Sequence, residues 1–216
     1  MSLDLLRAMQ LADSGFPSGT FAYSWGLEQA VEQGYVTRES FGVWLAAEML
    51  GRWAEFDRII MADAWRGKDP TRVDLETDTL FMAEPLRLQS AEAGQALLVA
   101  ASRLGDPTAR RFRLAVADGE AAGHLPVAQG AVFRSMGLSL ELALATSAHG
   151  AAQGLASAAV RLGLIGALQA QACLRDLHPD LASVTTPPSL DSLPASFAPV
   201  SEIAMMQPAD GRLFAN

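Results

Sequence analysis

Between Thr37 and Arg66 the large apolar side chains recur mostly at steps of three and four residues, the spacing of one face of an α-helix. The series consists of Phe41, Trp44, Leu45, Met49, Trp53, Phe56, Ile60 and Trp65. Gly67 follows the series and is expected to end the helix. No stretch of the chain alternates β-branched or aromatic residues with polar ones between turns, as a strand would. The pattern therefore predicts an all-helical chain.

Capping signals divide the rest of the chain into further helices. They predict one helix from Glu84 to Gly105, a second from Asp106 to about Ala117 and a third from Leu125 to Met136. A fourth helix is expected after Ser139. A last helix follows Gly163 and Gly166 and runs to Leu177. His178-Pro179 is expected to end that last helix. Frequent alanine and glycine indicate helices that approach one another closely. We expect an all-α, single-domain bundle of roughly eight to ten helices.

Two segments are predicted to lie outside the helices. Asp13–Thr20 is punctuated by glycine and proline and predicts a loop. Thr185–Pro199 contains Pro187, Pro188, Pro194 and Pro199 with little charge, which predicts an extended linker. We therefore expect a helical core over residues 1–184 and a proline-rich linker with a partner-binding tail over residues 185–216.

Charge restricts the classes of function. The formal net charge is −8 and no basic face of the kind that nucleic-acid-binding proteins present is evident, so we expect no nucleic-acid partner. Residues 1–120 hold 18 acidic and 12 basic side chains, but residues 121–216 hold only 6 and 4. The second half is therefore expected to be buried, in the core or under a partner. The 19 residues from Leu142 to Val160 carry no charge, but their alanine and polar content predicts a core helix and not a membrane span.

The compartment and the chemistry follow from what the sequence lacks. Cys173 is the one cysteine, which indicates a reducing compartment, and no signal peptide precedes the first helix, so we expect a cytoplasmic protein. The histidines, His124, His149 and His178, form no local ligand pair. The loop Gly15–Gly19 lacks the lysine and spacing of a phosphate-binding loop. We predict no enzyme activity, and no catalytic, cofactor-binding or metal-binding residue.

Protein binding is the better-supported class of function. Aromatic residues crowd the segment Gly15–Glu28, which suits either an interface or a corner of the core. The tail after the linker is more apolar than a disordered, solvent-exposed C-terminus would be. It therefore either folds back on the core or docks on a partner. The candidate partner-binding residues of these two segments are Phe21, Tyr23, Trp25, Glu28, Ile203, Met206, Arg212, Leu213 and Phe214.

Five segments, in order, resemble the urease accessory protein F (UreF) family. They are Leu11–Glu28; Glu84–Ser90 with Gly94–Leu98; Gly123–Val127 with Gly130–Val132 and Met136–Leu138; Ala158–Gly166; and Glu202–Gln207 with Arg212–Phe214. Together they span nearly the whole chain. The tail departs from the family pattern, because Pro208–Gly211 stands where the family usually has a histidine and then a tyrosine-serine.

The resemblance implies an all-helical, non-catalytic protein that assembles with the D accessory protein (also called H) and with the GTPase G. That assembly loads nickel into the urease apoprotein, and the resemblance implies that this chain recruits the GTPase and regulates it. We also expect a homodimer built from the charge-poor second half. Two alternatives stay open: an all-helical enzyme whose site is assembled from distant residues, and a direct nickel carrier.

Overall fold

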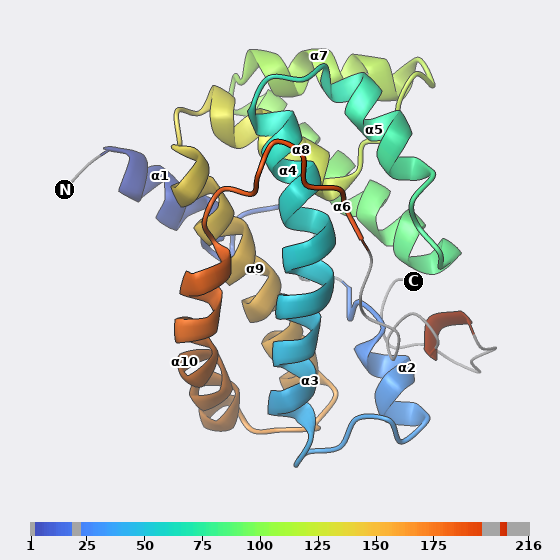
Figure 1. Ribbon diagram of the computed structural model, residues 1–216, viewed down its shortest axis with the longest axis vertical. Helices are drawn as coiled ribbons and strands as arrows, with labels where there is room; N and C mark the ends of the chain where they lie inside the picture. Colours follow the sequence, from blue (N-terminus) through green and yellow to red (C-terminus); the bar gives the residue numbers. More distant parts are fainter. Residues whose placement is uncertain (1–2, 19–22, 196–203, 207–216) are drawn as a thin grey trace.

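A computed structural model describes residues 3–18, 23–195 and 204–206, and within them every regular element is a helix (Figure 1). The elements are α1 Leu3–Ala12, α2 Leu27–Glu32, α3 Phe41–Ala47, η2 Glu48–Asp57, α4 Arg58–Trp65, α5 Pro70–Asp78, α6 Glu84–Arg103, α7 Pro107–Ala117, α8 Leu125–Ser135, α9 Leu140–Arg161 and α10 Ala167–Val184. The predicted all-α class is confirmed.

The periodic segment forms one unbroken column of α3, η2 and α4 (Figure 1). It begins at Phe41, four residues later than predicted, and Gly67 follows its end with a φ of 90°. Its middle ten residues are a π-helix, which the sequence did not predict. A π-helix is rare and often lies at functional sites. This one places Glu48, Trp53 and Phe56 inward, against the rest of the core.

The predicted capping residues are confirmed at the starts of two helices. The Asp106 side chain accepts a hydrogen bond from Ala109 N and so caps α7. Ser139 caps α9 in the same way through Leu142 N. One boundary was wrong: α10 continues through Pro179 to Val184. Continuing the helix buries Leu181 beside Leu177, and this burial offsets the backbone hydrogen bond that proline removes.

Small residues bring the central helices together, as predicted. On α8, a Cβ at Gly130 would overlap the carbonyl oxygen of Met61 on α4 and lie 2.8 Å from the Cβ of Ala64. The charge-poor α9 runs through the middle of the molecule and contacts α10, α1, α8 and α4. None of the described helices is long and apolar enough to cross a membrane.

The segment that follows α10 lies along the column. Arg58 Nη1 donates to the carbonyl oxygen of Val184 at 2.9 Å, Arg66 Nη2 donates to that of Pro188, and Ala195 N donates to Glu55 O at 2.7 Å. Residues 185–195 of the predicted linker are thus non-helical and are fastened to η2 and α4, where Figure 1 shows the segment crossing α4; residues 196–199 lie outside the described residues.

Candidate functional site

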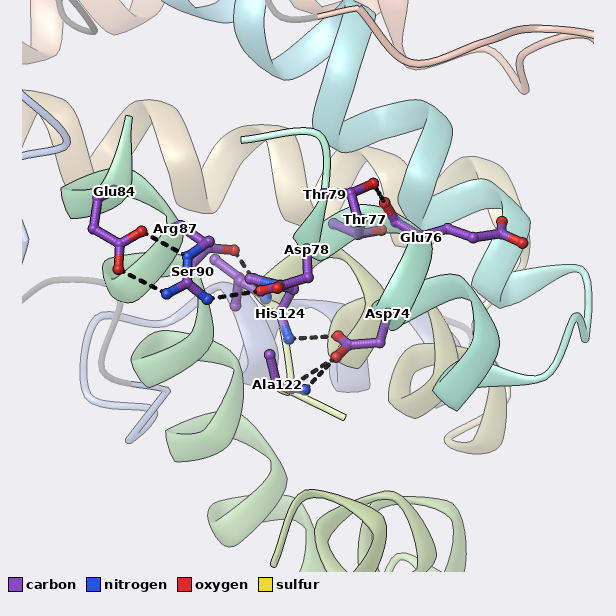
Figure 2. A network of polar contacts seen from close by, with 12 residues as sticks. Asp74, Glu76, Thr77, Asp78, Thr79, Glu84, Arg87, Ser90, Ala122 and His124 are labelled. Carbon is purple, nitrogen blue, oxygen red and sulfur yellow. Dashed lines mark hydrogen bonds and ion pairs between the residues drawn. The ribbon is translucent and has the colours of Figure 1, made fainter. Parts of the chain in front are cut away.

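A polar cluster joins α5, the start of α6 and the loop before α8 (Figure 2). We call it the clamp and define it as Asp74, Asp78, Glu84, Arg87, Ser90 and His124. Asp74 is fully buried and accepts three backbone hydrogen bonds, from Ala122 N, Gly123 N and His124 N at 2.6, 2.8 and 2.7 Å. These donors precede α8, so one carboxylate fixes the entry of that helix.

Asp78 lies one helical turn after Asp74 and forms the second half of the clamp. Its Oδ1 accepts from His124 Nε2 and from Arg87 Nη1, both at 2.9 Å. Burial raises the pKa of Asp78, but the hydrogen bonds from Arg87 and His124 and their charges outweigh it, so the net pKa is lowered. Arg87 also holds Glu84 through two hydrogen bonds, which lower the pKa of Glu84.

A histidine–aspartate pair is a component of catalytic sites, but the surroundings of His124 indicate a structural role. The side chain of His124 is fully buried, its Nδ1 has no hydrogen-bond partner in the part of the chain that the structure describes, and its ring lies 4.9 Å from the ring of Phe81. A substrate cannot reach a ring that is covered on all sides. The clamp therefore joins helix ends around the buried Asp74 and His124, while Glu84 at its edge is exposed.

The aromatic segment near the N-terminus forms a corner of the core. Tyr23, Trp25 and Glu28 are each 8% exposed or less. The Tyr23 hydroxyl donates to Glu92 Oε2 at 2.6 Å, and burial and this carboxylate raise the pKa of Tyr23. The Arg52 guanidinium lies 5.1 Å from the ring of Trp25. Of the two readings of these aromatics, the structure places the described ones in the core; Phe21 lies outside the described residues.

A small cavity of about 60 Å³ lies beneath η2. Trp53 Nε1 donates to Ser147 Oγ at 3.1 Å, and Ser147 Oγ donates to Gln129 Oε1 at 2.8 Å, so a polar chain crosses from η2 to α9 and α8. Burial raises the pKa of Asp57, while the charges of Arg52 and His124 oppose that rise. The Arg52–Asp57 ion pair is 3.6 Å long. The cavity is lined mainly by apolar groups, and this polar chain and ion pair lie in its wall.

The two histidines outside the clamp lie close together. His149 on α9 and His178 on α10 come together, with ring centroids 6.5 Å apart, although 29 residues separate them. Burial and the neighbouring His178 lower the pKa of His149. No group of three or more histidine, cysteine, aspartate or glutamate side chains suited to a metal ion occurs among the described residues.

The start of the tail contacts the core. Ala204 and Met205 are buried, the Ala204 carbonyl oxygen accepts from Gln33 Nε2 at 3.2 Å, and Met206 is 52% exposed. Ile203, Arg212, Leu213 and Phe214 lie outside the described residues. Only Met206 among the candidate tail residues therefore has a described position, and it faces solvent.

None of the six clamp residues was predicted as a site residue from the sequence. Asp74 and Asp78 are four residues apart, so they share one side of α5, and the UreF-like segments Glu84–Ser90 and Gly123–Val127 contain the other four clamp residues. Their partners His124 and Arg87 lie 46 and 9 residues away from Asp78, and only the fold brings them together.

Comparison with known proteins gives a consistent result. The family model described as UreF matches residues 36–178. A protein of Arthrobacter sp. named urease accessory protein UreF is 33% identical over 82% of this chain and 80% of its own length. Proteins with the same name are 35% identical in Cereibacter sphaeroides, over 89% of both chains, and 31% identical in Trichodesmium erythraeum, over 98% of this chain and 96% of the relative.

Proposed function

The chain belongs to the UreF family of urease accessory proteins, and from this membership we propose that it is a non-catalytic adaptor for nickel insertion into urease. In this role it binds the D-type accessory protein and the GTPase G together, recruits and regulates the GTPase, and reaches the urease apoprotein through them. The family match over residues 36–178 is the observation that carries this proposal.

The clamp supports a role without catalysis. Its ionisable side chains are used in contacts that fix helix ends, and His124 is sealed from solvent. A general base has to reach the proton that it removes, within hydrogen-bond distance or through one water molecule. For the clamp to act as an enzyme site, α5 or α8 would have to move away from His124.

We place the docking site for the D-type partner in the tail. Residues 184–195 are fastened to the column, and Met206 emerges beside α2 with its side chain half exposed. Ile203, Arg212, Leu213 and Phe214 would extend this surface with apolar side chains and a planar cation. Tyr23, Trp25 and Glu28 are buried, so in this proposal they act as positioning residues and do not touch the partner.

We also propose that two copies associate through the charge-poor corner between α9 and α10. No charged residue occurs from Leu162 to Leu174, and Leu168 in this stretch is 88% exposed. An exposed leucine within an uncharged stretch of the chain is a suitable centre for a self-complementary two-fold contact.

The proposal is tested by urease activation in cells. Deleting the gene for this chain from a urease-producing host should leave urease protein present but low in nickel and activity, and the intact gene should restore both. Full activity and nickel content in the deletion strain would contradict the proposed role.

A further inference from the structure

The exposed face of α7 is basic, although the chain as a whole is acidic. Residues 103–120 hold four of the sixteen basic residues, Arg103, Arg110, Arg111 and Arg113, and three carboxylates: Asp106, which is buried as the cap of α7, and Asp118 and Glu120, which are exposed at its end. All four arginines are exposed. The basic charge of this chain is therefore concentrated where the fold itself does not use it.

Helical geometry places the α7 arginines on one side. At 100° per residue, Arg113, Arg110, Leu114 and Arg111 follow one another around an arc of roughly 160°. Ala109 and Phe112 are buried and lie on the opposite arc, where α7 packs on α6 and α8. We call the exposed arc, together with Arg103 and Leu104 at the end of α6, the α7 face.

The arginines of the α7 face have no internal role. Within residues 3–18, 23–195 and 204–206, none of the four forms an ion pair or a side-chain hydrogen bond. Two other surface arginines are paired within the chain, Arg72 with Glu76 and Arg175 with Asp176. The α7 face thus presents arginines without ion pairs, and the exposed Asp118 that caps the end of α7 lies on the same arc.

Apolar side chains accompany these cations. Leu114 is 58% exposed in the middle of the arc, and Leu104 is 63% exposed at its edge. Arg103 and Leu104 also line an open groove with Met9, Phe16, Val99 and Ala100, between α1 and α6. Arginine mixed with exposed aliphatic side chains is the composition of a protein-binding surface.

We propose that the α7 face binds a carboxylate-rich surface of another protein of the urease maturation assembly, an inference that rests on the proposed function. Asp and Glu side chains of the partner bond to Arg110, Arg111 and Arg113, and an apolar side chain of the partner covers Leu114. Arginine suits this contact because its planar fork matches a carboxylate bidentately. A two-fold contact of the face with its own copy would bring like charges together, so the partner is a different chain.

The test measures affinities of the purified full chain for three purified probes: the D-type accessory protein, the GTPase G and the urease apoprotein. The Arg110→Glu/Arg111→Glu variant reverses two charges of the face. The matched control, Arg72→Glu/Arg175→Glu, reverses two arginines that are 80% and 73% exposed elsewhere. A second pair compares Leu114→Ser on the face with Leu75→Ser, whose side chain is 54% exposed on α5.

The expected result is a loss of on the order of tenfold or more in affinity for one probe with the Arg110→Glu/Arg111→Glu variant. Leu114→Ser should weaken the same complex, each control should stay near wild type, and the affected affinity should fall as salt rises. All variants should melt like wild type. If a charge reversal disturbs folding, Arg110→Gln/Arg111→Gln removes the charges and should show a smaller loss for the same probe.

Three outcomes would overturn the inference. Wild-type affinities of both face variants for all three probes would remove the α7 face from the assembly and leave the proposed function standing. Absence of any complex with the wild-type chain would overturn both. Binding of a DNA or RNA oligonucleotide that depends on Arg110 and Arg111, with protein affinities unchanged, would assign the face to nucleic acid.

Discussion

Gly94 on α6 lies directly against the backbone of the loop that holds Gly123. A Cβ on Gly94 would overlap the Gly123 carbonyl oxygen and lie 2.7 Å from both the His124 carbonyl carbon and Leu125 N. The same loop donates its amides to Asp74 on its other side. The entry of α8 is therefore held between a glycine surface and a buried carboxylate.

Gly94→Ala should destabilise the protein by about 1–3 kcal/mol, because the added methyl group meets backbone atoms that cannot rotate away. Alanine is otherwise favoured over glycine inside a helix by about 1 kcal/mol. Gly150→Ala on α9 is the matched control, since its Cβ would meet nothing within 4 Å. Urea unfolding monitored by circular dichroism measures both. Equal stability of the two variants would contradict the close contact.

Asp78→Asn should lower the free energy of unfolding at neutral pH. It should also make this free energy depend less on pH in the acidic range. The folded-state pKa of Asp78 lies below its ordinary value of 3.8, so the carboxylate binds fewer protons in the folded state. Its stabilisation is present above that ordinary value and is lost as the pH falls through the lower folded value. Wild type and variant should therefore differ most above about pH 5 and converge in stronger acid.

Glu84→Gln is the internal comparison for Asp78→Asn, because the pKa of Glu84 is also lowered by Arg87, but this side chain is exposed. Its effect should have the same sign and be smaller. If the free energy of unfolding of Asp78→Asn and of wild type changed with pH in parallel, the folded clamp would not favour the ionised form of the Asp78 carboxylate.

Leu168→Glu should convert a dimer into a monomer without loss of helical content. The substitution places a charge at the centre of the uncharged surface from Leu162 to Leu174. Leu75→Glu is the control, because Leu75 is also exposed but lies on α5. Light scattering at tens of micromolar gives the mass of each. If the wild-type chain were a monomer, or if Leu168→Glu remained a dimer, the proposed dimer contact at the corner between α9 and α10 would be ruled out.

Leu213→Ala/Phe214→Ala should weaken binding of the D-type partner roughly a hundredfold or more, since burial of each side chain contributes on the order of 1.5–3 kcal/mol. Deleting the whole tail is a poorer test, because it also removes the buried Met205 from the core. Melting temperature and pull-down are measured together. A lowered melting temperature with intact binding would mean that the two residues serve the core instead.

Local signals predicted most of the helices. Asp106 and Ser139 cap helices whose first turns need a side-chain acceptor, and Gly105 follows α6 with a φ of 94° that other residues rarely adopt. The end of the last helix was predicted wrongly at Pro179. The cost of a proline in a helix can be seen in the local sequence, whereas the burial of Leu181 that offsets it depends on the tertiary structure. The π-helix was hidden for a related reason: the spacing of Met49, Trp53 and Phe56 also fits an ordinary helix.

The candidate site was less predictable than the fold. The clamp depends on the meeting of Asp74 with Ala122 and of Asp78 with His124, and no local pattern connects residues that far apart. The aromatics of Gly15–Glu28 suited an interface and a core corner equally in sequence, and Tyr23 and Trp25 lie in the core. The arginines of α7 can be read in the sequence, but the net charge of −8 for the whole chain gave no indication that they share one side of a helix.

The most direct test of the adaptor role is co-expression of this chain with the D-type accessory protein and the GTPase G, followed by size-exclusion chromatography. We expect one peak that contains all three proteins. Without this chain, the GTPase should elute apart from the D-type protein. A complex of the D-type protein with the GTPase that forms equally well without this chain would rule out the adaptor role.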